Sequence, residues 1–352
     1  MRNVLFCLFV CFFVHVNNMN LFSQESASNY YLKAANFIKE NNKPQLSTSV
    51  DVFEFNKHIE KILDSRKDKN DTSTFCENDT LSSLEHVEEA MKLIRQGTLA
   101  KSCDWGTVVV NEWNYVSLPY LDDVAILNNL LELKIFDALD TNQYDQAIDY
   151  WRDMMTLARR LTHDQWFVSN MKGMEIEGRC IKLLVKHIDN LNNEQIRKIS
   201  NCWRSLPQRN PIEIAIMHDC TSFFDWVKDR PLQAALEMGY GFSMRACFLD
   251  DITVPITVNT YKYSVSDWIG AIYFCYRVDY SLVEKNIDEF STIITLPLCD
   301  FYERHASFSE KVDSLSNPCS IEVLYSLFPA VLAGKTAQSR INKLNIDFEK
   351  KL

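Results

Sequence analysis

Residues 144–161, YDQAIDYWRDMMTLARRL, carry the pattern that decides the fold of this chain. Apolar side chains recur there every three or four residues, which is the spacing that places them on one face of a helix. We therefore expect an amphipathic helix whose apolar face, Trp151 included, lies in the core. The side chains of this face are Tyr144, Ala147, Ile148, Trp151, Met155 and Ala158.

A short polar turn, Asp140-Thr141-Asn142-Gln143, precedes this helix, and a leucine-rich helical pattern beginning at Leu121 precedes the turn. Two helices joined by so few residues pack side by side. The pair resembles a tetratricopeptide unit, but no second copy follows at a period near 34 residues, so a repeat array is not expected.

Helical periodicity extends over most of the rest of the chain. Glycine is scarce, with 8 residues in 352, which also favours helices over sheets. One segment differs: in 252–265 (ITVPITVNTYKYSV) β-branched and aromatic residues alternate with others, which predicts a small hairpin turning at Asn259-Thr260. Residues 103–118 look irregular or extended. The expected helices cover 28–41, 51–65, 84–95, 121–161 (as a pair), 165–190, 193–204, 211–237 with Pro211 in its first turn, 266–293, 297–315 and 319–345.

These patterns predict a mainly α fold: an irregular array of antiparallel helical hairpins with at most a small β-hairpin near 252–265. The length suits one large domain or two ordinary ones. We expect a single helical domain over 28–352, interrupted by a polar loop at 67–83.

Residues 1–27 have the parts of a secretory signal peptide. Arg2 is followed by an apolar run over residues 4–16, and small residues stand at Ser23 and Ala27. The run is short for a membrane span, which needs about 20 apolar residues. We expect export to the periplasm or the medium, with cleavage after Ser23 or Ala27. The alternative is that residues 4–16 are retained and anchor the chain in a membrane.

Charge and cysteine content limit the classes of function. The net charge is −10 and the isoelectric point is near 5.3, so the chain is acidic, and no basic cluster suggests a nucleic-acid partner. Nine cysteines remain after the signal peptide, an odd number. Cys76 and Cys103, in polar surroundings, are the expected disulfide pair. Four others have apolar neighbours and are expected to pack as free thiols: Cys180, Cys202, Cys220 and Cys275.

No local motif names a catalytic, cofactor-binding or metal-binding residue. The tripeptide Gly334-Lys335-Thr336 lacks the earlier glycine of a phosphate-binding loop, since Pro329 stands at that position. Three acidic or histidine-containing clusters suit structural roles better. His218-Asp219-Cys220 lies within a predicted helix, where neighbouring side chains point about 100° apart and cannot form a nucleophile–base relay with one another. Glu303 and His305 face different ways and are expected to be exposed. Asp250-Asp251 suits a strand or helix cap.

Glu177 lies at the edge of an apolar helix face, beside Gly178. A carboxylate next to a core needs a partner, because burying an unpaired charge costs several kcal/mol. Arg159 and Arg160, at the end of the preceding helix, are the candidate donors. We expect an ion pair between adjacent helices and not a catalytic acid.

The block from Lys101 to Ile188 resembles a group of uncharacterised exported helical proteins typical of planctomycete-type bacteria. The matching features are low-specificity helical patterns spread over most of the chain, and this chain ends at Leu352 without the Tyr-Pro-like segment that members often carry. The resemblance implies an all-helical, exported bacterial protein and no catalytic residue. The features are Tyr30 to Ala34, Cys103-Asp104-Trp105, Leu118-Pro119, Asp140 to Ala147, Leu157 to Arg160, Met174 to Glu177 and Leu327-Phe328-Pro329.

These observations favour an exported helical binding or scaffolding protein that needs no cofactor or metal. Its partner would be a protein or an envelope component, and it would contact a membrane only through residues 4–16 if they stay uncleaved. Two alternatives remain open. One is an extracytoplasmic, hydrolase-like enzyme whose site is assembled from dispersed residues, and the other is a membrane-tethered envelope or export component.

Overall fold

The computed structural model describes residues 26–41, 57, 87–106, 118, 120–237, 256–258, 261–263, 271, 274–275, 277–315, 317–325 and 328–352. The expected signal peptide, the helix over 51–65, the polar loop over 67–83 and most of the irregular stretch 103–118 lie outside these residues. Within them the fold is mainly α, as the sequence predicts.

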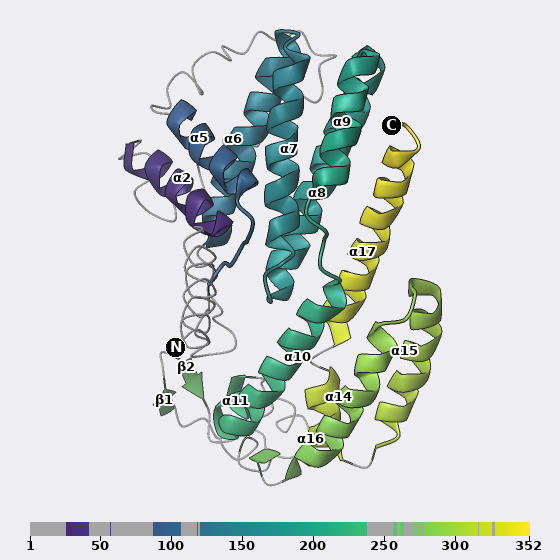
Figure 1. Ribbon diagram of the computed structural model, residues 1–352. Helices are drawn as coiled ribbons and strands as arrows, with labels where there is room; N and C mark the ends of the chain where they lie inside the picture. Colours follow the sequence, from purple (N-terminus) through teal and green to yellow (C-terminus); the bar gives the residue numbers. More distant parts are fainter. Residues whose placement is uncertain are drawn as a thin grey trace, which may run out of the picture.

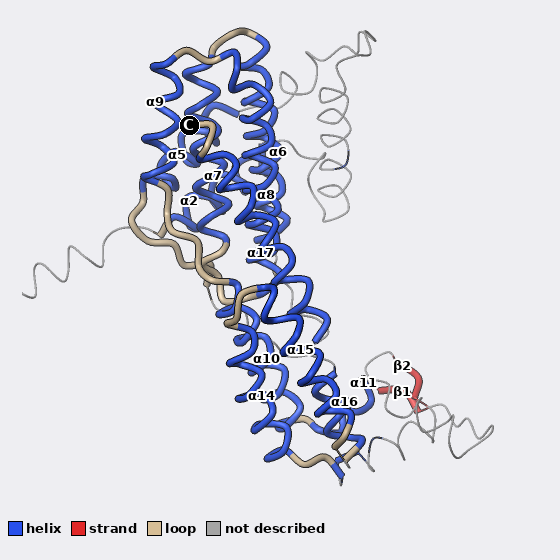
Figure 2. The backbone as a smooth tube through the Cα atoms, turned by 90° about the vertical axis from the view of Figure 1, so that its right-hand side faces the viewer, coloured by secondary structure: helices blue, strands red, loops and turns tan. Residues whose placement is uncertain are grey.

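The helices fall into an upper and a lower group (Figure 1), and the second view shows an elongated molecule (Figure 2). The upper group contains α2 (Ala27–Asn41), α5 (Val87–Leu99), α6 (Tyr120–Asp140), α7 (Tyr144–Leu161), α8 (Phe167–His187) with the 3-10 turn η2 (Ile188–Asn190), and α9 (Asn193–Ser205). The lower group contains α10 (Ile212–Asp229), α11 (Pro231–Glu237), α14 (Tyr280–Ile294), α15 (Leu298–Asp313) and α16 (Pro318–Tyr325).

The last helix, α17 (Phe328–Glu349), connects the two groups. It packs against α8 above and against α10, α15 and α16 below. In Figure 2 it runs along the molecule from one group to the other. The contacts of α17 with α8 and with α10 therefore hold the two groups together.

The turn between α6 and α7 explains why these helices fold back on one another. Asn142 adopts a left-handed conformation with φ 59°, which asparagine tolerates better than most residues. Its N–H donates to the carbonyl of Leu139 at 3.1 Å, and the N–H of Gln143 donates to that of Ala138 at 2.7 Å. This pair of bonds is a Schellman motif, which satisfies carbonyls that the end of α6 would otherwise leave free.

Helix α7 lies at the centre of the upper group, in contact with α5, α6, α8 and α9. The apolar face predicted from its sequence is confirmed. Trp151, Met155 and Ala158 are fully buried, and the Trp151 indole N–H donates to the carbonyl of Cys180 at 3.2 Å. Trp151 stacks on Trp203 and contacts Phe348, so α7, α9 and α17 meet at one aromatic cluster.

Three predicted helices are interrupted in the structure. The expected helix over 266–293 is broken at Val278 and Asp279, because Asp279 is extended and caps α14, which begins at Tyr280. The expected helix over 211–237 ends at Asp229 and resumes as α11, because Pro231 has no N–H to donate to the carbonyl of Val227. The expected helix over 319–345 consists of α16 and α17, since Pro329 likewise cannot donate to Tyr325. Pro211 is the residue before α10 and not part of its first turn.

The β-hairpin near 252–265 is confirmed by strands β1 (Ile256–Val258) and β2 (Tyr261–Tyr263). They pair antiparallel, with Ile256 opposite Tyr263 and Val258 opposite Tyr261. The turn residues between them lie outside the described part of the chain. These two short strands form the whole sheet of the described residues.

Candidate functional site

Glu177, on α8, is fully buried and has three hydrogen-bond donors. Its carboxylate accepts from Arg159 of α7 at 3.3 Å, from Arg209 before α10 at 3.4 Å, and from Asn345 of α17 at 3.2 Å. The predicted pair of Glu177 and Arg159 is therefore confirmed. The sequence did not indicate Arg209 or Asn345, because both are distant in the chain. Glu177 joins α7, α8 and α17, and this role is structural.

Arg160, the other predicted partner of Glu177, has a different role, so that half of the prediction is wrong. Its guanidinium donates to the carbonyls of Gly97 at 2.6 Å, Thr98 at 3.1 Å and Ala100. Consecutive helical residues point about 100° apart. Arg159 thus faces α8 while Arg160 caps the carbonyl end of α5.

Two further buried carboxylates tie helices together, and sequence reasoning missed both. Asp153 of α7 is fully buried, with Arg95 of α5 at 2.8 Å, and burial raises the pKa of Asp153 to about 6. Glu132 of α6 is buried and accepts from Arg179 of α8. The residues around Asp153 and Glu132 in the sequence do not indicate that these carboxylates are buried.

A separate polar cluster surrounds the first turn of α8. The Tyr120 hydroxyl donates to the Asp164 carboxylate and lies 2.7 Å from the Ser169 hydroxyl. Asp219 of α10 accepts from the N–H of Phe167 at 3.4 Å, where the N-cap residue, Trp166, makes no side-chain cap. Asp219 therefore caps α8 from another helix.

His218 and Asp219 are neighbours on α10 but have different surroundings, as the helical reading predicts. The His218 ring packs edge-on against Trp166, with ring centroids 4.9 Å apart, and burial lowers the pKa of His218. Burial raises the pKa of Asp219 to about 7, and the nearby Asp164 charge adds to this shift. Cys220 is buried, as expected for a packed thiol.

We expect Asp219→Asn to reduce the loss of stability as the pH rises. Because the folded-state pKa of Asp219 is about 7 against an ordinary value of 3.8, the folded protein holds a proton in this range that the unfolded chain has released. The contribution of Asp219 to the free energy of unfolding therefore decreases as the pH rises from about 4 to 7. Asparagine keeps the acceptor for Phe167 and cannot ionise.

The measurement is the melting temperature at pH 5 and pH 8 for the wild type and for Asp219→Asn. Asp225→Asn, which changes an exposed carboxylate on the same helix, is the matched control. The decrease in melting temperature between the two pH values should be smaller only in Asp219→Asn. Equal decreases in all three proteins would contradict the assignment.

The remaining sequence candidates occupy structural positions. Lys335 donates to Glu213 at 2.6 Å, so it ties α17 to α10. A Cβ on Gly334 would lie 2.8 Å from the Phe167 ring, which explains the glycine by close packing. Glu303 is exposed, as predicted, but His305 is half-buried against the rings of Phe290 and Phe301, because α15 turns that face towards α14.

The cysteine predictions have a mixed outcome. Cys180, Cys202, Cys220 and Cys275 carry free thiols, as expected. Cys103 is also free, so the expected bond to Cys76 is not formed; Cys76 itself lies outside the described residues. The Cys103 thiol packs beside α2, and burial raises its pKa to about 12. Asp250 and Asp251 lie outside the described residues too.

An open hollow of about 370 Å³ lies between α14 and α15. The helices face each other through residues spaced three or four apart, with apolar side chains forming the floor and polar ones the rim. Phe308 is almost fully buried in this floor, where it stacks on Phe290 at a centroid distance of 5.2 Å. The lining consists of Glu289, Thr292, Ile293, Leu296, Arg304, Ser307, Phe308 and Lys311.

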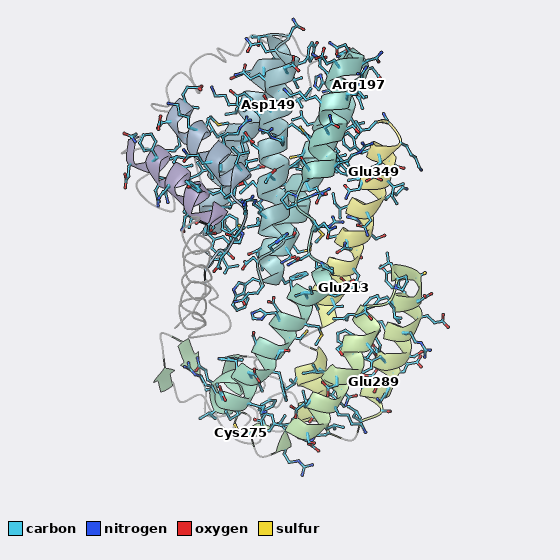
Figure 3. The ribbon with its side chains drawn as sticks, viewed as in Figure 1. Asp149, Arg197, Glu213, Cys275, Glu289 and Glu349 are labelled. Atoms are coloured by element: carbon cyan, nitrogen blue, oxygen red, sulfur yellow. The ribbon has the colours of Figure 1, made fainter. Side chains whose placement is uncertain are left out.

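The two basic side chains of the hollow differ. Lys311 forms an ion pair with Glu289 across the two helices. Arg304 is exposed and has neither a hydrogen bond nor an ion pair within the described part of the chain. Figure 3 places Glu289 in the lower group of helices, far from Arg197 at the upper end of α9. The hollow thus has one unpaired cation beside an apolar floor.

Comparison with protein-family models, with curated proteins and with solved structures gives no significant match. The resemblance to exported planctomycete-type proteins therefore stays a prediction. None of the described helices is long and apolar enough to cross a membrane. The described residues also contain no cluster of three or more histidine, cysteine, aspartate or glutamate side chains that could hold a metal ion.

Proposed function

We propose that this protein is an exported helical binding protein whose ligand site is the hollow between α14 and α15. The observation that carries the proposal is the combination of an apolar floor, at Ile293, Leu296 and Phe308, with polar groups on the rim. Small-molecule sites typically have this mixture and volumes of about 300–1,000 Å³. The buried ion pairs of the upper group join helices of this chain, so we assign them to the stability of the fold and not to the ligand site.

A neutral dye tests whether the hollow binds ligands. Nile red should bind the wild-type protein with increased fluorescence, because the dye leaves water for the apolar floor. Ser307→Trp should remove this binding by filling the hollow. Ala306→Trp, an exposed position next to it on α15 that does not line the hollow, is the matched control and should bind normally. Equal fluorescence in both variants would place the dye elsewhere and contradict the proposed site.

Export rests on residues 1–27 and has its own test. We expect the mature protein to begin after Ser23 or Ala27, because the apolar run at 4–16 is followed by small residues suited to signal-peptide cleavage. N-terminal sequencing of the protein recovered outside the cytoplasm measures this directly. A mature chain that still carries Met1 would favour the membrane-tethered alternative.

A further inference from the structure

The Glu289–Lys311 ion pair makes the two ends of the hollow chemically different. Because α14 and α15 are joined by the short segment 295–297, Leu296 and Arg304 lie towards the turn, and the ion pair lies at the other end. Arg304 and Lys311 are seven residues apart on one helix, a separation of about 10 Å. Arg304 thus stands near one end of the hollow and a neutralised charge pair stands at the other.

The chemistry of the two ends differs. A guanidinium without a partner offers several N–H donors in a fork that matches a carboxylate. At the opposite end the Glu289 carboxylate already neutralises Lys311 and would repel a second anionic group. Between the ends the surface is apolar, with Ile293, Leu296 and Phe308. The hydroxyls of Thr292 and Ser307 already donate to the carbonyls of Glu289 and Glu303.

Resting on the proposed function, we infer that the hollow binds small monocarboxylic acids with an apolar body about 10 Å long, with the carboxylate on Arg304 and the body over Phe308. A ligand with a second carboxylate at the far end is disfavoured by Glu289. An amide of the same length would still accept one hydrogen bond from the charged guanidinium but would lose the ion pair and the second acceptor oxygen. The ligand class is therefore defined by one anionic end and one neutral end.

Displacement of Nile red by three compounds with eight-carbon chains tests this inference. Octanoate should displace the dye at a several-fold lower concentration than octanamide, because its two carboxylate oxygens form an ion pair with the exposed guanidinium of Arg304. Suberate, the diacid of the same length, should be weaker than octanoate. The difference between octanoate and octanamide should shrink at high salt, since Arg304 is exposed to solvent.

Arg304→Gln should bring octanoate and octanamide to equal potency, when the displacement by each compound is referred to the Nile red affinity of the variant itself. Arg197→Gln removes an exposed positive charge of the same kind far from the hollow and should change nothing. If Nile red binds in the hollow but octanoate and octanamide are equivalent in the wild type, the carboxylate inference is wrong and the binding site stands. If Nile red binding is insensitive to Ser307→Trp, the proposed site itself is wrong.

Discussion

Trp151→Ala should lower the free energy of unfolding by about 3–5 kcal/mol, the usual cost of truncating a buried aromatic side chain to alanine. Trp151 is fully buried, its indole N–H donates to Cys180, and its ring packs on Trp203 and Phe348. The substitution therefore leaves a cavity where α7, α9 and α17 meet. It also leaves the Cys180 carbonyl without this donor.

Chemical denaturation measures this loss of stability, and a substitution of an exposed apolar residue serves as the control for removing apolar surface in general. Leu99→Ala is suitable, because Leu99 is 71% exposed at the end of α5, and it should change stability by less than about 0.5 kcal/mol. Trp151→Phe should lie between the two, since it keeps much of the volume and loses the hydrogen bond. A Trp151→Ala variant that unfolds like the wild type would mean that Trp151 lies outside the core.

Glu177→Gln should cost about 3 kcal/mol, in the range found when one partner of a buried ion pair is removed. Glutamine has nearly the same shape, so the loss comes from charge and not from volume. The side chains of Arg159 and Arg209 are only 12% and 13% exposed, and they would keep their charges without the carboxylate that now balances them.

Glu175→Gln is the matched control, because Glu175 lies on the same helix and its side chain is 53% exposed, paired with Lys172. An exposed pair of this kind contributes about 0–1 kcal/mol. The measurement is urea denaturation of both variants at neutral pH. If Glu177→Gln is no less stable than Glu175→Gln, then the carboxylate does not hold the three helices together.

The sequence determined the helices and which side chains lie on their apolar faces. Trp151 and Met155 are buried as predicted, since the spacing that places them on one helix face is a local property. The hairpin near 252–265 was predictable for the same reason. The divisions at Pro231 and Pro329 were missed, although their cause is local: proline lacks the N–H that a continuous helix requires.

Only the tertiary structure decided which charges are buried and which helix each one contacts. Glu177 was expected to meet an arginine, but whether Arg159 or Arg160 reaches it depends on how α7 is rotated between α5 and α8. Asp153 and Glu132 are buried because α6 and α7 are covered on several sides, a fact that periodicity along one helix does not contain.

The candidate binding site depends on tertiary structure for the same reason. Glu289, Thr292 and Ile293 lie on one face of α14, and Arg304, Ser307 and Phe308 lie on one face of α15, as helical spacing alone requires. Whether the two faces close tightly or leave a hollow depends on the distance and angle at which α14 and α15 pack. That geometry results from all the side chains between the helices together, so the sequence of either helix does not determine it.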